Sequence, residues 1–450
     1  MPQAKAGDFT VVPLGPGVDL YARALPKFKT TLFKAFLDTP LSDPREATRI
    51  ALATQCVKRG CRRLPDQRTL TRFLESLYGA SFGAGVSKMG ERQVASFRLE
   101  VLAERYARKR ERVTERGLEL LRDVLFDPLV AEGPAFPEAV FRQEVENHRR
   151  QLRARINDKA QYAAERLIEE MCHGEPYAIY EYGRLEDLDS LTSAETFDSW
   201  MRLVRTAPMR VFAVGDFEPT DVAKEVSRIF AGPIEKTGAG RLRASPGVVR
   251  VRPRRSRCVM EHVDVTQGKL AMGYRTDVTV HDKRYFGLIF ANAILGGGPQ
   301  GKLFRNVREK AQLAYYAHSA LDRVKGILSV HCGIAFDNFD MAVRIVKKQV
   351  GDVRAGRFTD DELRDARLAL ERGVQSADDA PGHKVNACQE GLVAGRVFSA
   401  KEILKGLRRV TRADIARAAA SLALDTVYFL RAPAGAVAGR AAAATPARAH

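Results

Sequence analysis

The second half of this 450-residue chain repeats the order of predicted elements found in its first half. In each half a strand is followed by two helices, two strands, two long helices, a last helix and a closing strand. The first copy runs from "TTLFKAFLDTPL" to "MRVFAVGD", and the second from "KLAMGYRT" to "TVYFLRAP". The last helix of each copy begins with a threonine three residues before an acid, Thr192 with Glu195 and Thr411 with Asp414. The repeat therefore predicts two copies of one α+β unit.

The segment between the copies, "AGPIEKTGAGRLRASPGVVRVRPRRSR", is rich in glycine, proline and arginine and has no hydrophobic periodicity. Such a composition is typical of a linker. The final segment, "AGAVAGRAAAATPARAH", has too little hydrophobic variety to pack, so we predict that it is disordered. We therefore predict a first domain over residues 1–235, a linker over 236–257, a second domain over 258–433 and a disordered tail over 434–450.

Several helices can be placed from their spacing and caps. Ser42 or Asp43 is a suitable N-cap for a helix that starts at Pro44, since proline is tolerated in a first helical turn. Long helices are predicted over about 107–125 and about 137–171, and a helix over "GKLFRNVREKAQ" in the second copy.

The chain has 73 Lys and Arg against 55 Asp and Glu, a net charge of +18. An excess of this size attracts nucleic acid, anionic membranes or acidic peptides. The basic residues are interleaved with acidic ones along amphipathic helices, as in "LAERYARKRERVTERGLELL", so the charge is spread over solvated faces. We therefore expect no nucleic-acid partner.

The spacing of the cysteines and the hydropathy of the chain indicate which cellular compartment to expect. The six cysteines form no CxxC pair or tight cluster of the kind that zinc sites and disulfide frameworks need. No apolar run approaches the roughly 18 residues of a membrane span, and "MPQAKAGDFTVVPLG" lacks the hydrophobic centre of a signal peptide. We expect reduced thiols, no membrane partner and a cytoplasmic location.

A glycine-rich turn, "LGGGPQG", contains Gly296, Gly297 and Gly298. Backbone N–H groups at such a turn can bind phosphate at a helix N-terminus. A P-loop, however, requires GxxxxGK[ST] after a strand, whereas Lys302 is followed by Leu303 and the preceding segment has helical spacing. The turn is predicted to be a helix C-cap and a sharp corner.

Arg308 and Tyr315 follow this turn in "RNVREKAQLAYY". A separation of seven residues is about two helical turns, so both side chains share a face if the helix persists. An arginine can pair with a carboxylate and a phenol can donate a hydrogen bond to an oxyanion. Spacing alone is also compatible with ordinary surface and core packing.

The chain as a whole resembles the M16 (pitrilysin/insulinase) family of zinc peptidases. The stretch "LGGGPQGKLFRNVREKAQLAYYAHSAL", the duplicated halves and the motifs "LESLYGA", "SFRLEVL" and "EEMCHGEPYA" carry the resemblance, which spans about residues 10 to 432. It is closest to the short bacterial two-domain members that are non-catalytic. The resemblance implies an α+β fold of two tandem LuxS/MPP-like α/β-roll domains, each an antiparallel sheet packed with helices, forming a clam-like half of a peptidase chamber.

The same family binds zinc through an inverted HxxEH motif on the first helix and a later glutamate. Two histidines four residues apart share a helical face and hold the metal, and the glutamate between them serves as general base. The motif positions correspond here to Ala51, Thr54 and Gln55, and no histidine precedes His148. A substitute pair, Glu144 with His148, is conceivable, but an exposed histidine on a charged helix is the expected reading. His173 is expected to end a helix, and four further histidines are dispersed and expected to be structural: His262, His281, His318 and His331.

By this resemblance the chain is a non-catalytic subunit that holds no cofactor, while a zinc-bearing M16 homologue completes a heterodimer. Tyr315 and Arg308 match the family's paired Arg/Tyr motif, so they would act in the partner's catalytic site. Together with Gly296, Gly297 and Gly298 they would bind small, flexible peptides. Two alternatives remain open: a peptide-binding or assembly protein without a proteolytic partner, and an autonomous zinc peptidase with atypical ligands.

Overall fold

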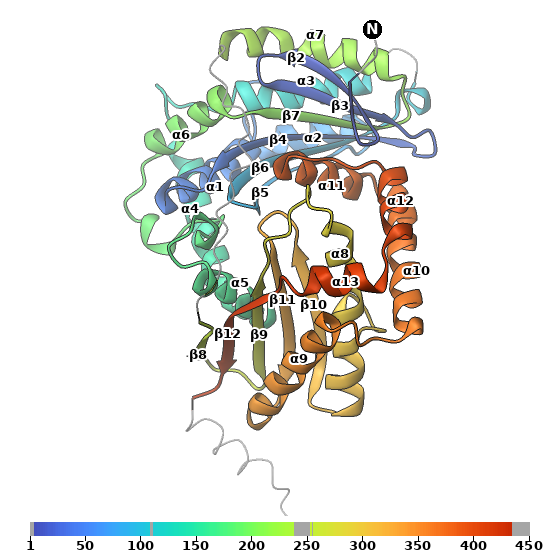
Figure 1. Ribbon diagram of the computed structural model, residues 1–450. Coiled ribbons are helices and arrows are strands. Elements are labelled where there is room, and N and C mark those ends of the chain that lie inside the picture. Colours follow the sequence, from blue (N-terminus) through green and yellow to red (C-terminus); the bar gives the residue numbers. More distant parts are fainter. Residues whose placement is uncertain (1–3, 109–110, 238–252, 254, 434–450) are drawn as a thin grey trace, which may run out of the picture. The chain divides into compact units, whose positions relative to one another are not determined.

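The computed structural model describes residues 4–108, 111–237, 253 and 255–433 (Figure 1). The tail predicted over 434–450 and most of the linker predicted over 236–257 lie outside these residues. The chain forms two compact units, each assembled from three stretches of sequence. Unit 1 comprises Met1–Arg153, Ile179–Val248 and Gln375–Ile403, and unit 2 comprises Ala154–Ala178, Val249–Val374 and Leu404–His450.

Unit 1 is built on a seven-stranded sheet of order β1-β2-β3-β7-β4-β6-β5. The strands are β1 Ala4–Ala6, β2 Phe9–Gly15, β3 Val18–Ala24, β4 Thr30–Pro40, β5 Ser81–Met89, β6 Arg92–Leu102 and β7 Met209–Gly215. The helices are α1 Pro44–Lys58, α2 Gln67–Ser76, α3 Val113–Phe126, α4 Glu138–Ala154, α6 Ser193–Thr206, α7 Pro219–Thr237 and α11 Pro381–Ala394.

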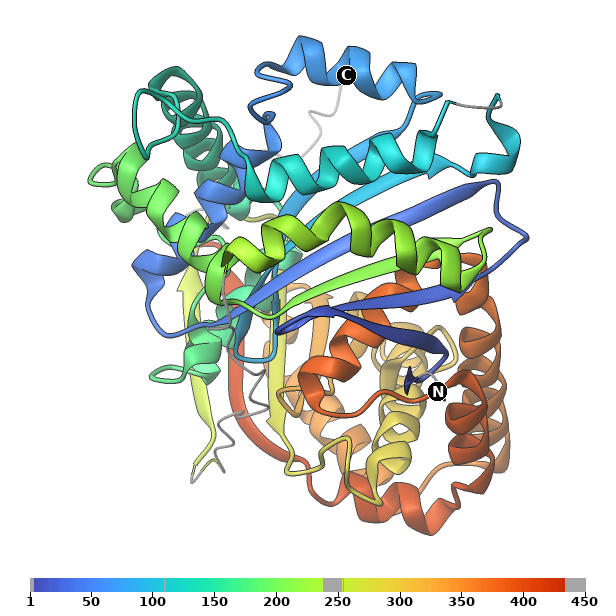
Figure 2. The ribbon, with the colours of Figure 1, turned by 90° about the horizontal axis from the view of Figure 1, so that it is seen from above.

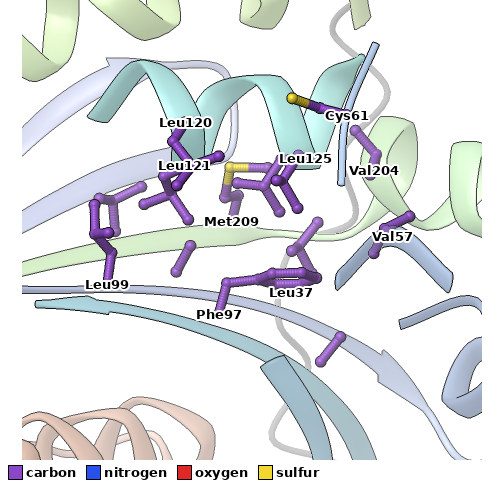
Figure 3. Close-up of a cluster of buried hydrophobic side chains, with 14 of the residues drawn as sticks. Leu37, Val57, Cys61, Phe97, Leu99, Leu120, Leu121, Leu125, Val204 and Met209 are labelled. Carbon is purple, nitrogen blue, oxygen red and sulfur yellow. The ribbon is translucent and has the colours of Figure 1, made fainter. Parts of the chain in front are cut away.

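One face of this sheet holds the larger core of unit 1. Side chains alternate along β4, so Phe33, Ala35 and Leu37 point to this face, where α1, α3, α6 and α7 pack. Figure 2 shows α3 and α7 side by side over the strands. In Figure 3 Leu37 and Phe97 from the sheet meet Leu121 and Leu125 from α3. The opposite face of β4, carrying Leu32 and Phe36, forms a separate core.

Unit 2 is built on a five-stranded sheet of order β10-β11-β9-β12-β8. Its strands are β8 Arg257–His262, β9 Gly268–Arg275, β10 Ala314–Asp322, β11 Ile327–Ile334 and β12 Ala423–Arg431. Its helical elements are α5 Lys159–Met171, α8 Tyr285–Gly296, the π-helical segment η5 Phe304–Lys310, α9 Phe339–Arg354, α10 Asp360–Ser376 and α13 Arg412–Ala419. The helix α12, Ala400–Arg409, begins in unit 1 and ends in unit 2.

The predicted duplication is confirmed by strand order. The order β3-β7-β4-β6-β5 in unit 1 corresponds strand for strand to β8-β12-β9-β11-β10 in unit 2. The pairing directions agree as well, because β3 and β7, like β8 and β12, are parallel and the remaining neighbours are antiparallel. The fold is a mixed α+β architecture, as predicted.

The two units exchange one helix each. The helix α5 belongs to the first half of the sequence but packs on β9 and β12 of unit 2, burying Ala163 and Leu167. Its counterpart α11 belongs to the second half but packs on β4 and β7 of unit 1, burying Val385 and Cys388. The compact units therefore do not coincide with the consecutive ranges 1–235 and 258–433, because each exchanged helix packs on an apolar face of the sheet of the other unit.

Helix caps explain where several helices begin. Asp43 caps α1 by accepting a hydrogen bond from the Arg45 backbone, as one of the two expected alternatives. Thr192 and Thr411 both form complete capping boxes with the acids three residues later, as predicted.

Three predicted helices have different limits or geometry. The helix predicted over about 137–171 is broken, because a 3-10 turn at Arg155–Asn157 separates α4 from α5 and Asp158 caps α5. The helix predicted from about residue 107 begins only at Val113. The segment predicted as a helix over "GKLFRNVREKAQ" contains the π-helical η5.

All six cysteines lie in described residues and are free thiols, five of them buried and Cys258 exposed. Among the helices of the described chain, none combines the length and the low polarity that crossing a membrane requires.

Candidate functional site

The zinc-motif positions on α1 are occupied by side chains that serve the fold of unit 1. Ala51 and Thr54 are fully buried, and the Thr54 hydroxyl donates to the Ile50 carbonyl oxygen at 2.7 Å. Gln55 is half-buried. The methyl of Ala51 offers no donor atom, and neutral hydroxyl or amide oxygens are poor zinc ligands beside imidazole and carboxylate. These positions therefore hold α1 in the core.

Glu144 on α4 is the carboxylate that faces α1. It is 4% exposed and receives hydrogen bonds from the Arg59 guanidinium and, at 3.0 Å, from the Asn147 amide. The guanidinium neutralises this carboxylate, so the charge that a metal would otherwise balance is already paired. The Glu144 charge also acts on the Cys56 thiol, whose pKa is raised first by burial and then by this carboxylate.

The expectation that His148 is exposed is wrong. The side chain is 1% exposed, and its Nε2 donates to the Tyr182 carbonyl oxygen at 2.8 Å. Burial lowers the pKa of His148, so the ring is neutral at pH 7. The signal available in the sequence was the spacing Phe141, Val145, His148, which places the histidine on the apolar face of α4.

These residues do not fit the zinc that the family resemblance implies. Glu144 is paired with Arg59, and His148 uses Nε2 for a backbone carbonyl. Across the described residues, no group of three or more His, Cys, Asp or Glu side chains is placed to hold a metal ion.

The glycine turn lies after α8, and its glycines have different surroundings. A Cβ on Gly296 would lie 2.7 Å from the Ser319 backbone nitrogen on β10, so glycine is needed for α8 to approach the strand. Gly297 caps α8, and its backbone N–H donates to the Asn292 carbonyl oxygen. A Cβ on Gly298 would meet nothing within 4 Å. The turn is thus a helix C-cap and corner, as its sequence predicts.

Tyr315 lies on β10, the edge strand of the five-stranded sheet. Ala314 pairs with Ile334 and Tyr316 with Gly333, so Tyr315 is the extra residue of a β-bulge. Bulges re-aim side chains and occur at sheet edges and near active sites. The Tyr315 side chain is 73% exposed, far more than the other large exposed hydrophobic residues of the described chain.

Arg308 lies on η5, which packs against β10. The helix does not persist to Tyr315, because it ends at Lys310 and Gln312 has a positive φ of 53°. The exposed Arg308 guanidinium lies 4.6 Å from the centroid of the Phe304 ring. No carboxylate among the described residues pairs with it, so the polar groups of both Arg308 and Tyr315 are exposed.

A polar surface beside Tyr315 was missed by sequence reasoning. The even-numbered positions of β10 place Tyr316 and His318 next to Gly333 and His331 of β11. The two imidazoles stack with ring centroids 5.2 Å apart. Burial, and then the neighbouring His318, lower the pKa of His331 to about 4. The sequence signal was alternation in two consecutive strands, but their pairing register needed the structure.

Comparison with known proteins gives consistent results. The family model described as "Peptidase M16 inactive domain" matches residues 191–370. The "Probable inactive metalloprotease YmfF" of Bacillus subtilis is 33% identical over 411 residues, covering 91% of this chain and 95% of that protein.

Solved structures share the fold over nearly the whole chain. A conserved protein from Enterococcus faecalis superposes with a TM-score of 0.85 at 26% identity, covering 95% of this chain and 99% of that one. A peptidase M16 inactive domain from Pseudomonas fluorescens superposes with a TM-score of 0.75 at 16% identity, covering 95% of this chain and 98% of that one.

Proposed function

The chain belongs to the M16 (pitrilysin/insulinase) family, and from that premise we propose that it is the non-catalytic subunit of a heterodimeric M16-type zinc peptidase. Its partner would be a homologue that carries the zinc motif. The observation that carries the proposal is an asymmetry within one chain. The zinc positions on α1 are filled by Ala51, Thr54 and Gln55, whereas Tyr315 stays exposed on a bulge of β10, the strand against which the Arg308-bearing η5 packs.

An exposed tyrosine on an edge-strand bulge contributes little to packing, since it buries little surface. Its hydroxyl can donate a hydrogen bond to a peptide carbonyl or to the oxyanion that develops during hydrolysis. Arg308 would orient the peptide through a backbone carbonyl or a carboxylate. In this role the two side chains supply the partner's site with groups for binding and for transition-state stabilisation.

The edge strand also suggests how a substrate is held. The outer side of β10 has no strand neighbour among the described residues, so its backbone can pair with an extended peptide. Small, flexible peptides satisfy this requirement because they adopt a strand without first unfolding. The six free thiols are compatible with a reducing compartment, and we place the pair in the cytoplasm.

Copurification tests the partner. A tagged chain recovered from native lysate of its own source is expected to bring down a zinc-bearing M16 homologue in stoichiometric amount. Recovery without such a homologue would instead support the peptide-binding or assembly alternative. Zinc analysis of the chain purified by itself tests the autonomous peptidase, which requires close to one equivalent of bound metal.

Turnover by the reconstituted heterodimer tests the role of Tyr315. Tyr315→Phe is expected to lower turnover by roughly 100-fold, since loss of one preorganised oxyanion donor costs about 3 kcal/mol. Assembly should be unchanged, because the side chain is largely exposed. The matched control is Tyr106→Phe in unit 1, also on an exposed tyrosine, which should not affect turnover. Equal turnover of wild type and Tyr315→Phe would rule out the catalytic role.

A further inference from the structure

Three cross-strand neighbours form a row across the five-stranded sheet of unit 2, and the row begins at Tyr316, next to Tyr315. Tyr316 on β10 pairs with Gly333 on β11, and Gly333 pairs with Lys269 on β9. A Cβ on Gly333 would lie 2.5 Å from Cε1 of Tyr316, so the tyrosine ring lies over the glycine. The ring reaches Lys269, whose Nζ is 5.4 Å from the ring centroid. The row thus connects the bulge to Lys269.

Lys269 is a half-buried cation without an anionic partner. Its Nζ donates to Gln267 Oε1 at 2.7 Å, and no carboxylate among the described residues lies within ion-pair distance. Burial lowers the pKa of Lys269, and the more distant Asp158 carboxylate opposes this shift. An ammonium has three donors, so hydrogen bonds remain for a further acceptor.

The acid whose charge acts on Lys269, Asp158, already caps a helix. Asp158 caps α5, and its Oδ1 accepts hydrogen bonds from the backbone nitrogens of Ala160 at 3.1 Å and Gln161 at 3.0 Å. Moving this carboxylate to Lys269 would uncap the helix, at a typical cost of about 1 kcal/mol. Lys269 is therefore left available to a carboxylate from outside the chain.

A cavity of about 610 Å³ gives access to Lys269. Its walls come from the start of α5 and from the loop before β9, both within unit 2. The lining includes Asn157, Asp158, Lys159, Thr266, Gln267 and Lys269. Asp264 also lines the cavity, but this exposed residue has an interaction of its own. The cavity is large enough for a carboxylic side chain and its hydrogen-bonding water.

We infer that Lys269 is a specificity subsite for an acidic side chain of the peptide that binds at Arg308 and Tyr315. The inference rests on the proposed function. Neighbouring strands are about 4.8 Å apart, so the Cα atom of Lys269, two strands away, is about 10 Å from the Cα atom of Tyr316. The part of the peptide that leaves the edge of β10 at Tyr315 and crosses the face of the sheet over β11 covers this distance in about three extended residues. The preferred peptide carries a glutamate or aspartate about three residues from the bond held at Tyr315.

The test uses matched peptides and the full chain. Fluorescent peptides that differ only by glutamate or glutamine at that position are titrated into the chain alone, and their cleavage is measured with the partner. The wild-type chain should bind the glutamate peptide at least about tenfold more tightly. Lys269→Met should remove this preference, and Lys269→Arg should keep most of it. Lys269→Glu should reverse it toward a peptide with lysine at that position.

Lys159→Met is the control within the same cavity, since it changes the charge equally. An equal loss of preference in Lys159→Met and Lys269→Met would show diffuse attraction and overturn the inference. Equal binding of both peptides by the wild-type chain would also overturn it, without any variant that could misfold. If binding discriminates through Lys269 but turnover does not depend on Tyr315, the subsite stands and the proposed catalytic contribution fails.

Discussion

The guanidinium of Arg59, the C-cap residue of α1, donates to the buried Glu144 carboxylate on α4, and this ion pair joins the two helices. The side chain of Arg59 is 27% exposed and that of Glu144 is 6% exposed. A largely buried ion pair adds little to the stability of the fold compared with an apolar pair of similar size. Removal of one partner, however, leaves the other charge buried and unpaired.

We expect Arg59→Met to destabilise the chain by about 2 kcal/mol, because Glu144 would stay buried without its cation. The double variant with Glu144→Leu should recover much of this loss. Urea denaturation measures both free energies of unfolding. Arg142→Met provides the comparison, since Arg142 forms an exposed pair with Glu138 worth less than about 1 kcal/mol. A loss in Arg59→Met no larger than that of Arg142→Met would contradict the prediction.

Gly296 and Gly298 should respond differently to the same substitution. Gly296→Ala places a Cβ 2.7 Å from the Ser319 backbone nitrogen and should destabilise unit 2 by about 1–3 kcal/mol. Gly298→Ala meets open space and should change stability by less than about 0.5 kcal/mol. Thermal unfolding of the two variants provides the comparison. Equal midpoints would show that α8 and β10 have room for a methyl group.

The lowered pKa of Glu175 predicts that unit 2 loses stability in acid. Burial alone would raise the pKa of Glu175, but hydrogen bonds from Arg275 and Lys325 outweigh it and lower the pKa below 4.5. A carboxyl with a lowered pKa stabilises the fold above its unfolded pKa, and this stabilisation is lost as pH falls through the folded pKa. Glu175→Gln should therefore lose stability at pH 7, and its difference from wild type should shrink below about pH 4.5. A difference independent of pH would contradict this assignment.

The packing of α11 on the sheet of unit 1 predicts how a fragment without this helix unfolds. A fragment of residues 1–235 lacks α11, so the face of β4 and β7 that carries Phe36 and Phe212 loses its cover. This fragment should bind a hydrophobic dye and unfold without a cooperative transition. Fusing residues 375–403 to it through a flexible linker should restore cooperativity. Identical cooperative unfolding with and without 375–403 would show that α11 is dispensable for unit 1.

Local sequence patterns predicted the features that depend on neighbouring residues. The capping boxes at Thr192 and Thr411 involve residues three positions apart, so their sequence was sufficient. The break before α5 could have been predicted in the same way, because Asp158 is a good N-cap residue inside the helix assigned to about 137–171. The burial of His148 was likewise visible in the apolar spacing of α4.

The sequence by itself determined the duplicated α+β plan and the absence of an HxxEH motif, since both are properties of residue order. Tertiary structure alone decided the exchange of α5 and α11, the pairing of Arg59 with Glu144 and the exposure of Tyr315. Each of these depends on contacts between distant segments: residues 59 and 144 are 85 positions apart, and the bulge at Tyr315 exists only in register with β11. Periodicity shows that a helix has an apolar face but does not specify which of two similar sheets will cover it.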